Sequence, residues 1–351
     1  MASKRIRRMV GFHSCALGFI LAAVSNARQA TTAWLLPALL CSGLARSQPP
    51  PPDVAPSQSD SGTRPLVPSS TQYLIESNRR ISYVSAAGGI GSIEPLWFEG
   101  RFVAPFGLYR QYASVVVSME AVLRMYREDS APVKTPSFMP GLTLAGPRLY
   151  HSLVAVTLRH HSNGQSGNFY QNPTAPRDAR VINHETGDFG TNFLEFAVLS
   201  ATDKHVPVRD FALNLWGKLA FEVHPGFGFG EADELQGHGC SSGPYGRCRL
   251  NAAFDVTVRS KLFWVVQAEN RLRLDYTFIF GDLDVPAVAS HGPHPGPHIL
   301  GATYVWKPVA KANDLGVFVN AYWGQDYYNI YFDRRLWVLR MGLAVYPFEI
   351  L

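Results

Sequence analysis

The sequence predicts an all-β protein, a transmembrane antiparallel up-and-down β-barrel of about twelve strands. Three observations favour this class. Segments of about ten residues alternate apolar and polar side chains, as strands with one apolar face do. Arg, Glu and Asp gather on the polar face, where they would be costly in a small soluble core but can pair inside a wide barrel. The connections alternate between short and long, which is typical of outer-membrane barrels.

The N-terminal part of the chain predicts export. Residues 1–47 combine a basic start with two apolar runs, and neither run reaches the roughly 18 apolar residues of a spanning helix. We interpret this segment as a secretory signal peptide, with an uncleaved helical anchor as the alternative. Residues 48–70 are rich in Pro and Ser and predict a disordered linker, which leaves residues 71–351 for the barrel domain.

The strand pattern begins soon after this linker. In residues 112–126, for example, Val115, Val117 and Met119 share one face and Glu120 lies on the other. An up-and-down order then places both ends of the barrel on the periplasmic side. The predicted strands are residues 80–87, 96–106, 112–126, 137–146, 150–162, 192–201, 210–224, 249–258, 262–280, 299–307, 315–323 and 336–347.

The connections between these strands fall into two sets. Those predicted to be short periplasmic turns are residues 202–208, 259–261 and 308–314. Those predicted to be long external loops are residues 163–191, 225–249, 282–298 and 324–334. Cys240 and Cys248 lie in one long loop of an exported chain and predict a disulfide. The net charge of +5 is not gathered in one tract past the N-terminus, so the sequence does not predict nucleic-acid binding.

The most informative stretch is residues 149–164, LYHSLVAVTLRHHSNG. At a spacing of two, His160 and Ser162 end a largely apolar face, which is the lipid side of a barrel. Asn192 begins the next predicted strand, so the antiparallel pair brings it beside His160 at the outer surface. A serine nucleophile, a histidine base and an amide that orients the histidine are thereby predicted to converge.

These residues resemble the outer-membrane phospholipase A family, whose hallmark is a strand ending His-x-Ser-Asn-Gly and an asparagine at the start of the following strand. This chain has His160-His161-Ser162-Asn163-Gly164 and then Asn192. Residues 130–140 and 320–329 are also similar to loop segments of that family. The resemblance implies hydrolysis of acyl esters of membrane glycerophospholipids in the bacterial outer membrane, with Ser162 as nucleophile, His160 as general base and Asn192 orienting the ring.

The same resemblance implies further roles. The backbone N–H of Gly164 is expected to bind the oxyanion, and Ca²⁺ is expected as cofactor near it. The matching calcium ligands are the Gln165 carbonyl, Asp188 and the Ala131 carbonyl of a second copy, because Ca²⁺ prefers oxygen ligands. A homodimer is expected as the active form.

Two other classes remain open at the level of sequence. A barrel that is only a pore or scaffold needs no His/Ser pair, and a lipid A deacylase also uses His-x-Ser but with an acidic third residue. The charged interior and Asn192 favour the phospholipase. His291, His294 and His298 are spaced by Gly and Pro and are interpreted as a solvated loop, with transition-metal binding as the alternative. His161 and Glu195 are expected to face the interior.

Overall fold

The computed structural model describes residues 81–110, 113–146, 152–176, 179–201, 211–226, 235, 240, 242–262, 266–283, 293–308 and 315–345. The predicted signal peptide and linker, residues 1–70, lie outside these described residues, as does His291. Within them the structure is all-β, with two short 3₁₀ turns, η2 (Ala86–Gly88) and η5 (Asn329–Asp333). No helix in the described part of the chain is long and apolar enough to cross a membrane.

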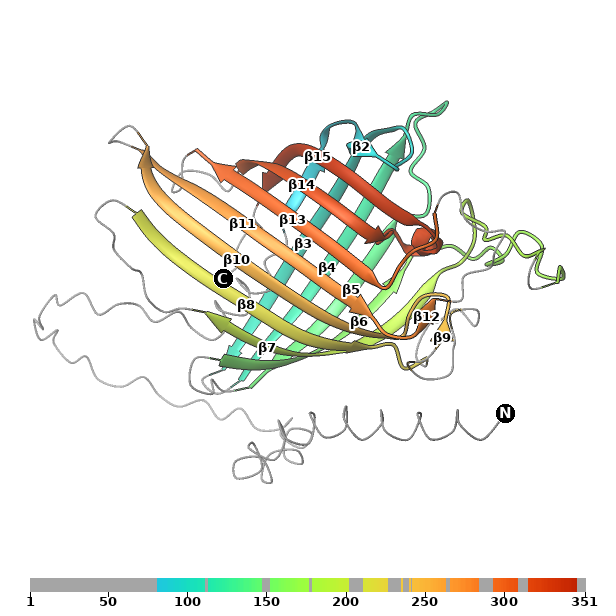
Figure 1. Ribbon diagram of the computed structural model, residues 1–351, viewed down its shortest axis with the longest axis horizontal. Coiled ribbons are helices and arrows are strands. Elements are labelled where there is room, and N and C mark those ends of the chain that lie inside the picture. Colours follow the sequence, from blue (N-terminus) through green and yellow to red (C-terminus); the bar gives the residue numbers. More distant parts are fainter. Residues whose placement is uncertain are drawn as a thin grey trace, which may run out of the picture. The chain divides into compact units, whose positions relative to one another are not determined.

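A closed barrel of twelve antiparallel strands confirms the predicted fold class (Figure 1). Each long strand pairs with the next along the chain, and β1 closes the ring by pairing with both β3 and β15. The strands are β1 (Ser82–Ser85), β3 (Leu96–Arg110), β4 (Ala113–Tyr126), β5 (Ser137–Ala145), β6 (Ser152–Ser162), β7 (Gly190–Ala201), β8 (Phe211–Val223), β10 (Cys248–Leu262), β11 (Val266–Ile279), β13 (His298–Lys307), β14 (Leu315–Gln325) and β15 (Arg335–Val345). Two short segments, β9 (Ser242–Gly243) and β12 (Asp282–Leu283), pair with each other outside the barrel sheet.

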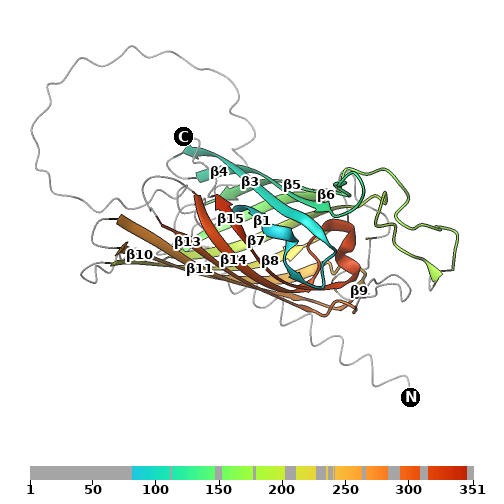
Figure 2. The same cartoon turned by 90° about the horizontal axis from the view of Figure 1, so that it is seen from above.

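The first strand contains a bulge that the sequence prediction missed. Both β1 and β2 (Ile90–Gly91) pair with β15, but the five steps from Ser85 to Ile90 face only three from Gly342 to Leu339. The extra residues form η2, where Gly88 and Gly89 have positive φ angles of 66° and 116°. The predicted strand at residues 80–87 is therefore one strand interrupted by a bulge, beside β15 in Figure 2.

One predicted turn is wrong. Residues 259–261 were expected to connect two strands, but β10 continues to Leu262 and pairs with β11 through that residue. Arg259 reaches across this pairing to Glu269, with 2.8 Å between Nε and Oε2. The polar run Arg-Ser-Lys is thus strand, because its arginine has an ion-pair partner inside the barrel.

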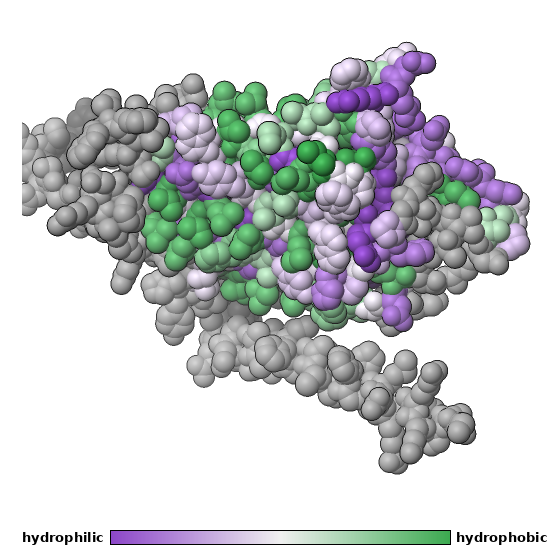
Figure 3. Space-filling view, turned by 45° about the horizontal axis from the view of Figure 1, so that its top comes forward, coloured by the Kyte–Doolittle hydropathy of each residue, from purple (hydrophilic) through white to green (hydrophobic). Residues whose placement is uncertain are grey.

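The outside of the barrel carries the apolar face of nearly every strand. Exposed residues on β6, β7 and β15 include Leu158, Phe196 and Met341, at 51%, 51% and 59% exposure. In Figure 3 the apolar side chains cover the flank of the strands, and polar ones gather toward the end from which the loops project. Such an apolar belt is the surface of a barrel that lies in a bilayer.

The inside of the barrel carries paired charges. Lys218 Nζ lies 2.6 Å from Glu195 Oε1, and Arg271 Nε lies 2.5 Å from Asp255 Oδ2. His161 is also inside, 4% exposed, with Nε2 3.1 Å from the Ser137 hydroxyl. The inward directions expected for Glu195 and His161 agree with these contacts.

We call the end of the barrel that carries residues 163–189 and 326–334 the loop end. There, Tyr328, Ile330 and Phe332 of the β14–β15 connection are fully buried and pack with Phe169 and Ile182 of the β6–β7 loop. Both connections lie beside one another at the right of Figure 1. An aromatic cluster therefore covers the loop end of the lumen and fixes the base of the β6–β7 loop.

Candidate active site

The geometry of the site follows from the pairing of β6 with β7. The register sets His160 opposite Asn192, as the sequence predicted from a single connecting loop. Their side chains meet on the outside of the barrel, with 2.9 Å between His160 Nδ1 and Asn192 Oδ1. Asn192 is 9% exposed, so water competes weakly for this contact.

This hydrogen bond determines the tautomer of the histidine. Because Oδ1 of an amide can only accept, Nδ1 of His160 must carry the proton. The other ring nitrogen, Nε2, is then unprotonated and can accept a proton. A general base for a hydroxyl nucleophile needs this arrangement.

Ser162 ends β6, two residues after His160 and on the same face. It pairs with Phe138 of β5 on one side and Gly190 of β7 on the other. In the described structure its hydroxyl is not hydrogen-bonded to His160. Neighbours at this spacing are about 7 Å apart at Cα, and a rotation about χ1 of the serine brings such side chains closer.

Asn163 holds the backbone that follows the serine. It is 1% exposed, and its amide Nδ2 donates to Gly187 O at 2.7 Å. Its Oδ1 accepts from the backbone N–H groups of Gln165 at 3.2 Å and Phe189 at 3.0 Å. These bonds connect both ends of the β6–β7 loop and fix the direction of the chain through Gly164.

Gly164 itself has a φ of +66° and an exposed position. This left-handed conformation favours glycine. A Cβ there would meet nothing closer than Phe138 at 3.8 Å, so the requirement is conformational and the space beside its backbone is open. An open backbone N–H next to a serine is suited to an oxyanion.

The predicted calcium residues lie in two loops. Gln165 and Asp188 are both at the base of the β6–β7 loop, where Asp188 N donates to Gly167 O at 3.0 Å. Ala131 lies in the β4–β5 loop with a φ of 44°. Among the described residues there is no group of three His, Cys, Asp or Glu side chains that could hold a metal. The oxygens of Gln165 and Asp188 are the hard donors that suit Ca²⁺, and they share one end of the loop that follows Ser162.

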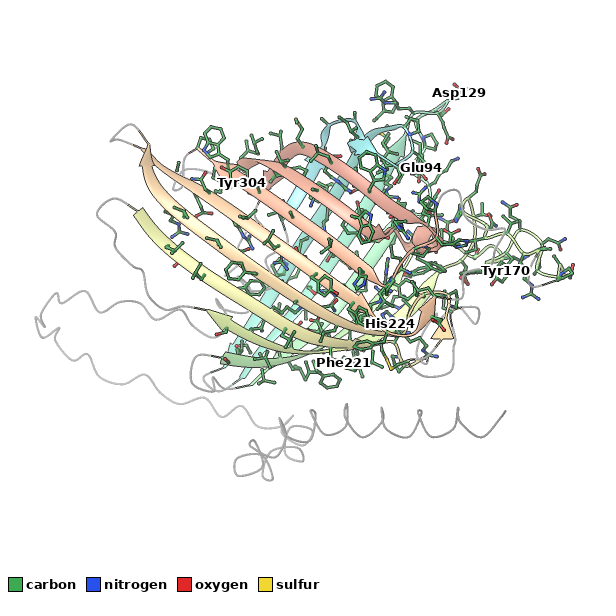
Figure 4. All side chains as sticks on the ribbon, in the orientation of Figure 1. Glu94, Asp129, Tyr170, Phe221, His224 and Tyr304 are labelled. Atoms are coloured by element: carbon green, nitrogen blue, oxygen red, sulfur yellow. A yellow bond between two sulfur atoms is a disulfide. The ribbon has the colours of Figure 1, made fainter. Side chains whose placement is uncertain are left out.

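A buried polar chain behind Asn192 was not predicted. Thr191 Oγ1 lies 2.9 Å from His224 Nδ1, and His224 Nε2 lies 2.8 Å from Glu222 Oε1. Burial, together with Arg249 and Arg247, outweighs Glu222 and lowers the pKa of His224. Figure 4 places His224 at the loop end and Tyr170 on the projecting β6–β7 loop. This chain fixes the start of β7, and its residues carry no motif that a sequence could reveal.

Other predicted residues have structural positions. Cys240 and Cys248 form a disulfide that ties the β8–β10 loop to the first residue of β10. His298 begins β13, and its Nδ1 lies 2.9 Å from the Tyr276 hydroxyl.

Comparison with known proteins gives a weak structural likeness. No protein-family model matches the sequence, and no curated protein sequence matches it significantly. Among solved structures, the chain is similar to "outer membrane phospholipase A from Escherichia coli", with a TM-score of 0.41 and 12% identity. The match covers 71% of this chain and 78% of that one. At this level of similarity, any function has to be argued from the residues of the chain itself.

Proposed function

We propose that the protein is a phospholipase of a bacterial outer membrane that hydrolyses acyl esters of glycerophospholipids. The observation that carries the proposal is the hydrogen bond of His160 to Asn192 on the lipid-facing side of the barrel, two residues from Ser162. A soluble hydrolase would turn this arrangement toward water. Here it faces outward near the loop end of β6 and β7, and we assign this position to the level of the lipid ester groups.

The reaction follows from the atoms in place. Ser162 Oγ attacks the ester carbonyl carbon while His160 Nε2 takes its proton, and Asn192 Oδ1 holds the Nδ1–H of the resulting imidazolium. The Gly164 N–H donates to the oxyanion. When the tetrahedral species collapses, His160 protonates the departing glycerol oxygen and the acyl group stays on Ser162. A water molecule, deprotonated by His160, then releases the fatty acid and restores the serine.

The surroundings of the site favour a lipid. Phe138, Leu158 and Phe196 are 39%, 51% and 51% exposed around the His160–Asn192 pair. Apolar side chains at a bilayer surface attract acyl chains and favour an ester that carries them over a small water-soluble ester. We therefore assign the substrate to membrane phospholipids.

We further propose that Ca²⁺ assists the reaction, held by the Gln165 carbonyl and Asp188, with the Ala131 carbonyl of a second copy completing the site in a homodimer. A bound Ca²⁺ would polarise the ester carbonyl and add positive charge next to the oxyanion. Both loop ligands are on the segment that Asn163 connects to the start of β7.

The test is phospholipid hydrolysis by the refolded protein in detergent micelles, with Ca²⁺ or with chelator, comparing wild type and Ser162→Ala. We expect fatty acid release that requires Ca²⁺ and disappears in the variant. Release that survives chelation would remove the metal site and keep the enzyme. A folded wild-type barrel that releases nothing would overturn the proposal, and release from lipopolysaccharide instead of phospholipid would make it a lipid A deacylase.

A further inference from the structure

A second lipid-facing feature lies on the opposite side of the barrel from the candidate active site. β14 is six strands from β6 in either direction around the ring. There the outer surface contains a groove of about 810 Å³ over β10, β11, β13, β14 and β15. Its volume falls within the roughly 300–1,000 Å³ of small-molecule sites.

The groove arises from the register of five strands. A row of directly opposed residues across these strands is called a rung here. One rung consists of Phe254, Leu274, Ala302, Ala321 and Leu339. The two central alanines are small and their neighbours are large, so the surface is hollow between them. The next rung toward the loop end reads Ala252, Tyr276, Leu300, Trp323 and Trp337, which places aromatic rings along that side of the hollow.

Two basic side chains lie beyond this aromatic rung. The Arg335 guanidinium is 5.4 Å from the centre of the ring of Trp323, one of the residues that line the groove. Its Nε is buried, and among the described residues it has no hydrogen-bond partner. Because this atom is buried, a ligand would meet the terminal nitrogens of the guanidinium, for which no hydrogen bond is seen among the described residues.

His298 supplies the second basic group. Its Nδ1 contacts the Tyr276 hydroxyl at 2.9 Å, and its ring stacks on Tyr276 at 25° between planes. When the tyrosine donates to Nδ1, the ring carries its proton on Nε2, which can donate to an anionic oxygen. A basic rung, an aromatic rung and an apolar hollow thus follow one another from the loop end toward the middle of the barrel.

We propose that this surface binds one glycerophospholipid, with its phosphate on Arg335 and His298 and an acyl chain in the groove floored by Ala302 and Ala321. The order of the rungs matches the order of groups in such a lipid, from charged headgroup through interface to chain. One guanidinium and one groove suit one phosphate and one chain, so a lipid with several phosphates and many chains is a poorer match. The site is separate from the candidate active site and does not depend on its chemistry.

The chain offers a matched control for Arg335. Arg127 also lies over a tryptophan at the loop end, 5.1 Å from the Trp97 ring. Its Nε, however, donates to Leu96 O at 2.8 Å, and Trp97 does not line the groove. The two arginines therefore share a tryptophan contact and differ in the unused donor and the groove below.

The experiment is native mass spectrometry of the refolded full chain in detergent, titrated with an ether-linked phosphatidylglycerol that no esterase can cleave. We expect one retained lipid on wild type and on Arg127→Gln. Arg335→Gln should weaken retention by about tenfold, because one charge-assisted hydrogen bond is lost. Ala321→Leu should weaken retention by raising the floor of the groove. An ether-linked dialkylglycerol without phosphate should bind wild type no better than it binds Arg335→Gln.

Three results would overturn the proposal. Equal retention by wild type, Arg335→Gln and Ala321→Leu would show nonspecific lipid around the barrel. Stronger retention of lipid A than of phosphatidylglycerol would assign the surface to a different lipid. A lipid-free dimer that Ala321→Leu dissociates would show that a second copy of the chain covers the groove.

Discussion

Asn192 acts on the candidate reaction through one atom. Its Oδ1 holds the Nδ1–H of His160 at 2.9 Å without adding a negative charge next to the ring. The amide therefore selects the tautomer and the ring orientation, and it stabilises an imidazolium less than a carboxylate would. Asn192 is a positioning residue, and its removal should reduce turnover more than lipid binding.

Asn192→Ala is expected to lower kcat by about 10²-fold with little change in KM, since the base loses its fixed orientation while the apolar surface for lipid remains. Asn192→Asp should recover part of the loss, because a carboxylate also accepts from Nδ1–H. Micellar phospholipid assays over a range of substrate concentrations measure both constants. Asn320→Ala, on the opposite side of the barrel, is the control, and a kcat that Asn192→Ala leaves unchanged would remove this residue from the mechanism.

Residue positions on neighbouring strands were the most predictable part of the site. The sequence placed His160 beside Asn192 because one loop joins their strands and the alternation sets the facing side. Asn163 stands within the recognised motif, yet its three bonds to the loop depend on where Gly187 and Phe189 return. The Thr191–His224 contact depends on the register of β7 with β8, which no local pattern encodes.

The β14–β15 connection is an element whose stability depends on one buried carboxylate. Asp326 is 2% exposed and accepts from both terminal nitrogens of Arg124, at 3.0 and 2.9 Å. It also accepts from Arg334 Nε at 3.0 Å. Burial alone would raise the pKa of Asp326, but Arg124 and Arg334 outweigh burial and lower it to about 2.

A carboxylate whose pKa is lower in the folded state than in the unfolded state stabilises the fold. This stabilisation is fully present above the unfolded-state pKa and is lost as the pH falls through the folded-state pKa. Asp326 should therefore contribute about 2 kcal/mol to stability above pH ~4, and this contribution should disappear as the pH approaches about 2. Urea unfolding of wild type and Asp326→Asn, followed by tryptophan fluorescence at several pH values, measures the difference. The difference in free energy of unfolding between the two proteins should narrow as the pH falls from about 4 to about 2. A difference that stays constant from pH 7 to pH 2 would contradict the role of the ion pairs. Glu128→Gln, at an exposed pair with Lys134, is the matched control and should change little.

Elements were predicted well where side chains alternate and less well where backbone or ion pairing decides. Ten residues of alternation locate β4 or β15 because one face must meet lipid and the other the lumen. The bulge at η2 depends on the positive φ angles of Gly88 and Gly89 and on the pairing with β15. The local sequence Ala-Ala-Gly-Gly alone therefore does not predict it. The end of β10 was misplaced because the partner of Arg259 lies ten residues away on β11.

At the scale of the whole molecule, a count of twelve strands does not determine whether the interior of the barrel is filled or open. Barrels of about 8 strands are filled by side chains, and porins of about 16–18 strands hold an open channel. In this chain the described interior is lined by ion pairs, such as that of Arg124 with Glu99, whose atoms lie 2.9 Å apart and whose side chains are both fully buried. Arg340 also pairs with Glu99, so a guanidinium from β4 and one from β15 meet on one carboxylate from β3. Because β15, β1, β3 and β4 are consecutive in the ring, these side chains fill the lumen beside one part of the wall. Asp326, which follows β14, extends the network by accepting from Arg124 of β4.

The same contacts predict that the protein does not conduct ions as a porin does. The described lumen is narrowed by the Glu99 network and covered at the loop end by Tyr328, Ile330 and Phe332. Planar-bilayer recordings of the refolded protein at neutral pH should show no steady conductance steps of porin size, with a porin recorded in the same membrane as the positive control. Stable porin-sized steps would favour the pore alternative, since a lumen that is narrowed by buried ion pairs and covered at one end should not pass a current of that size.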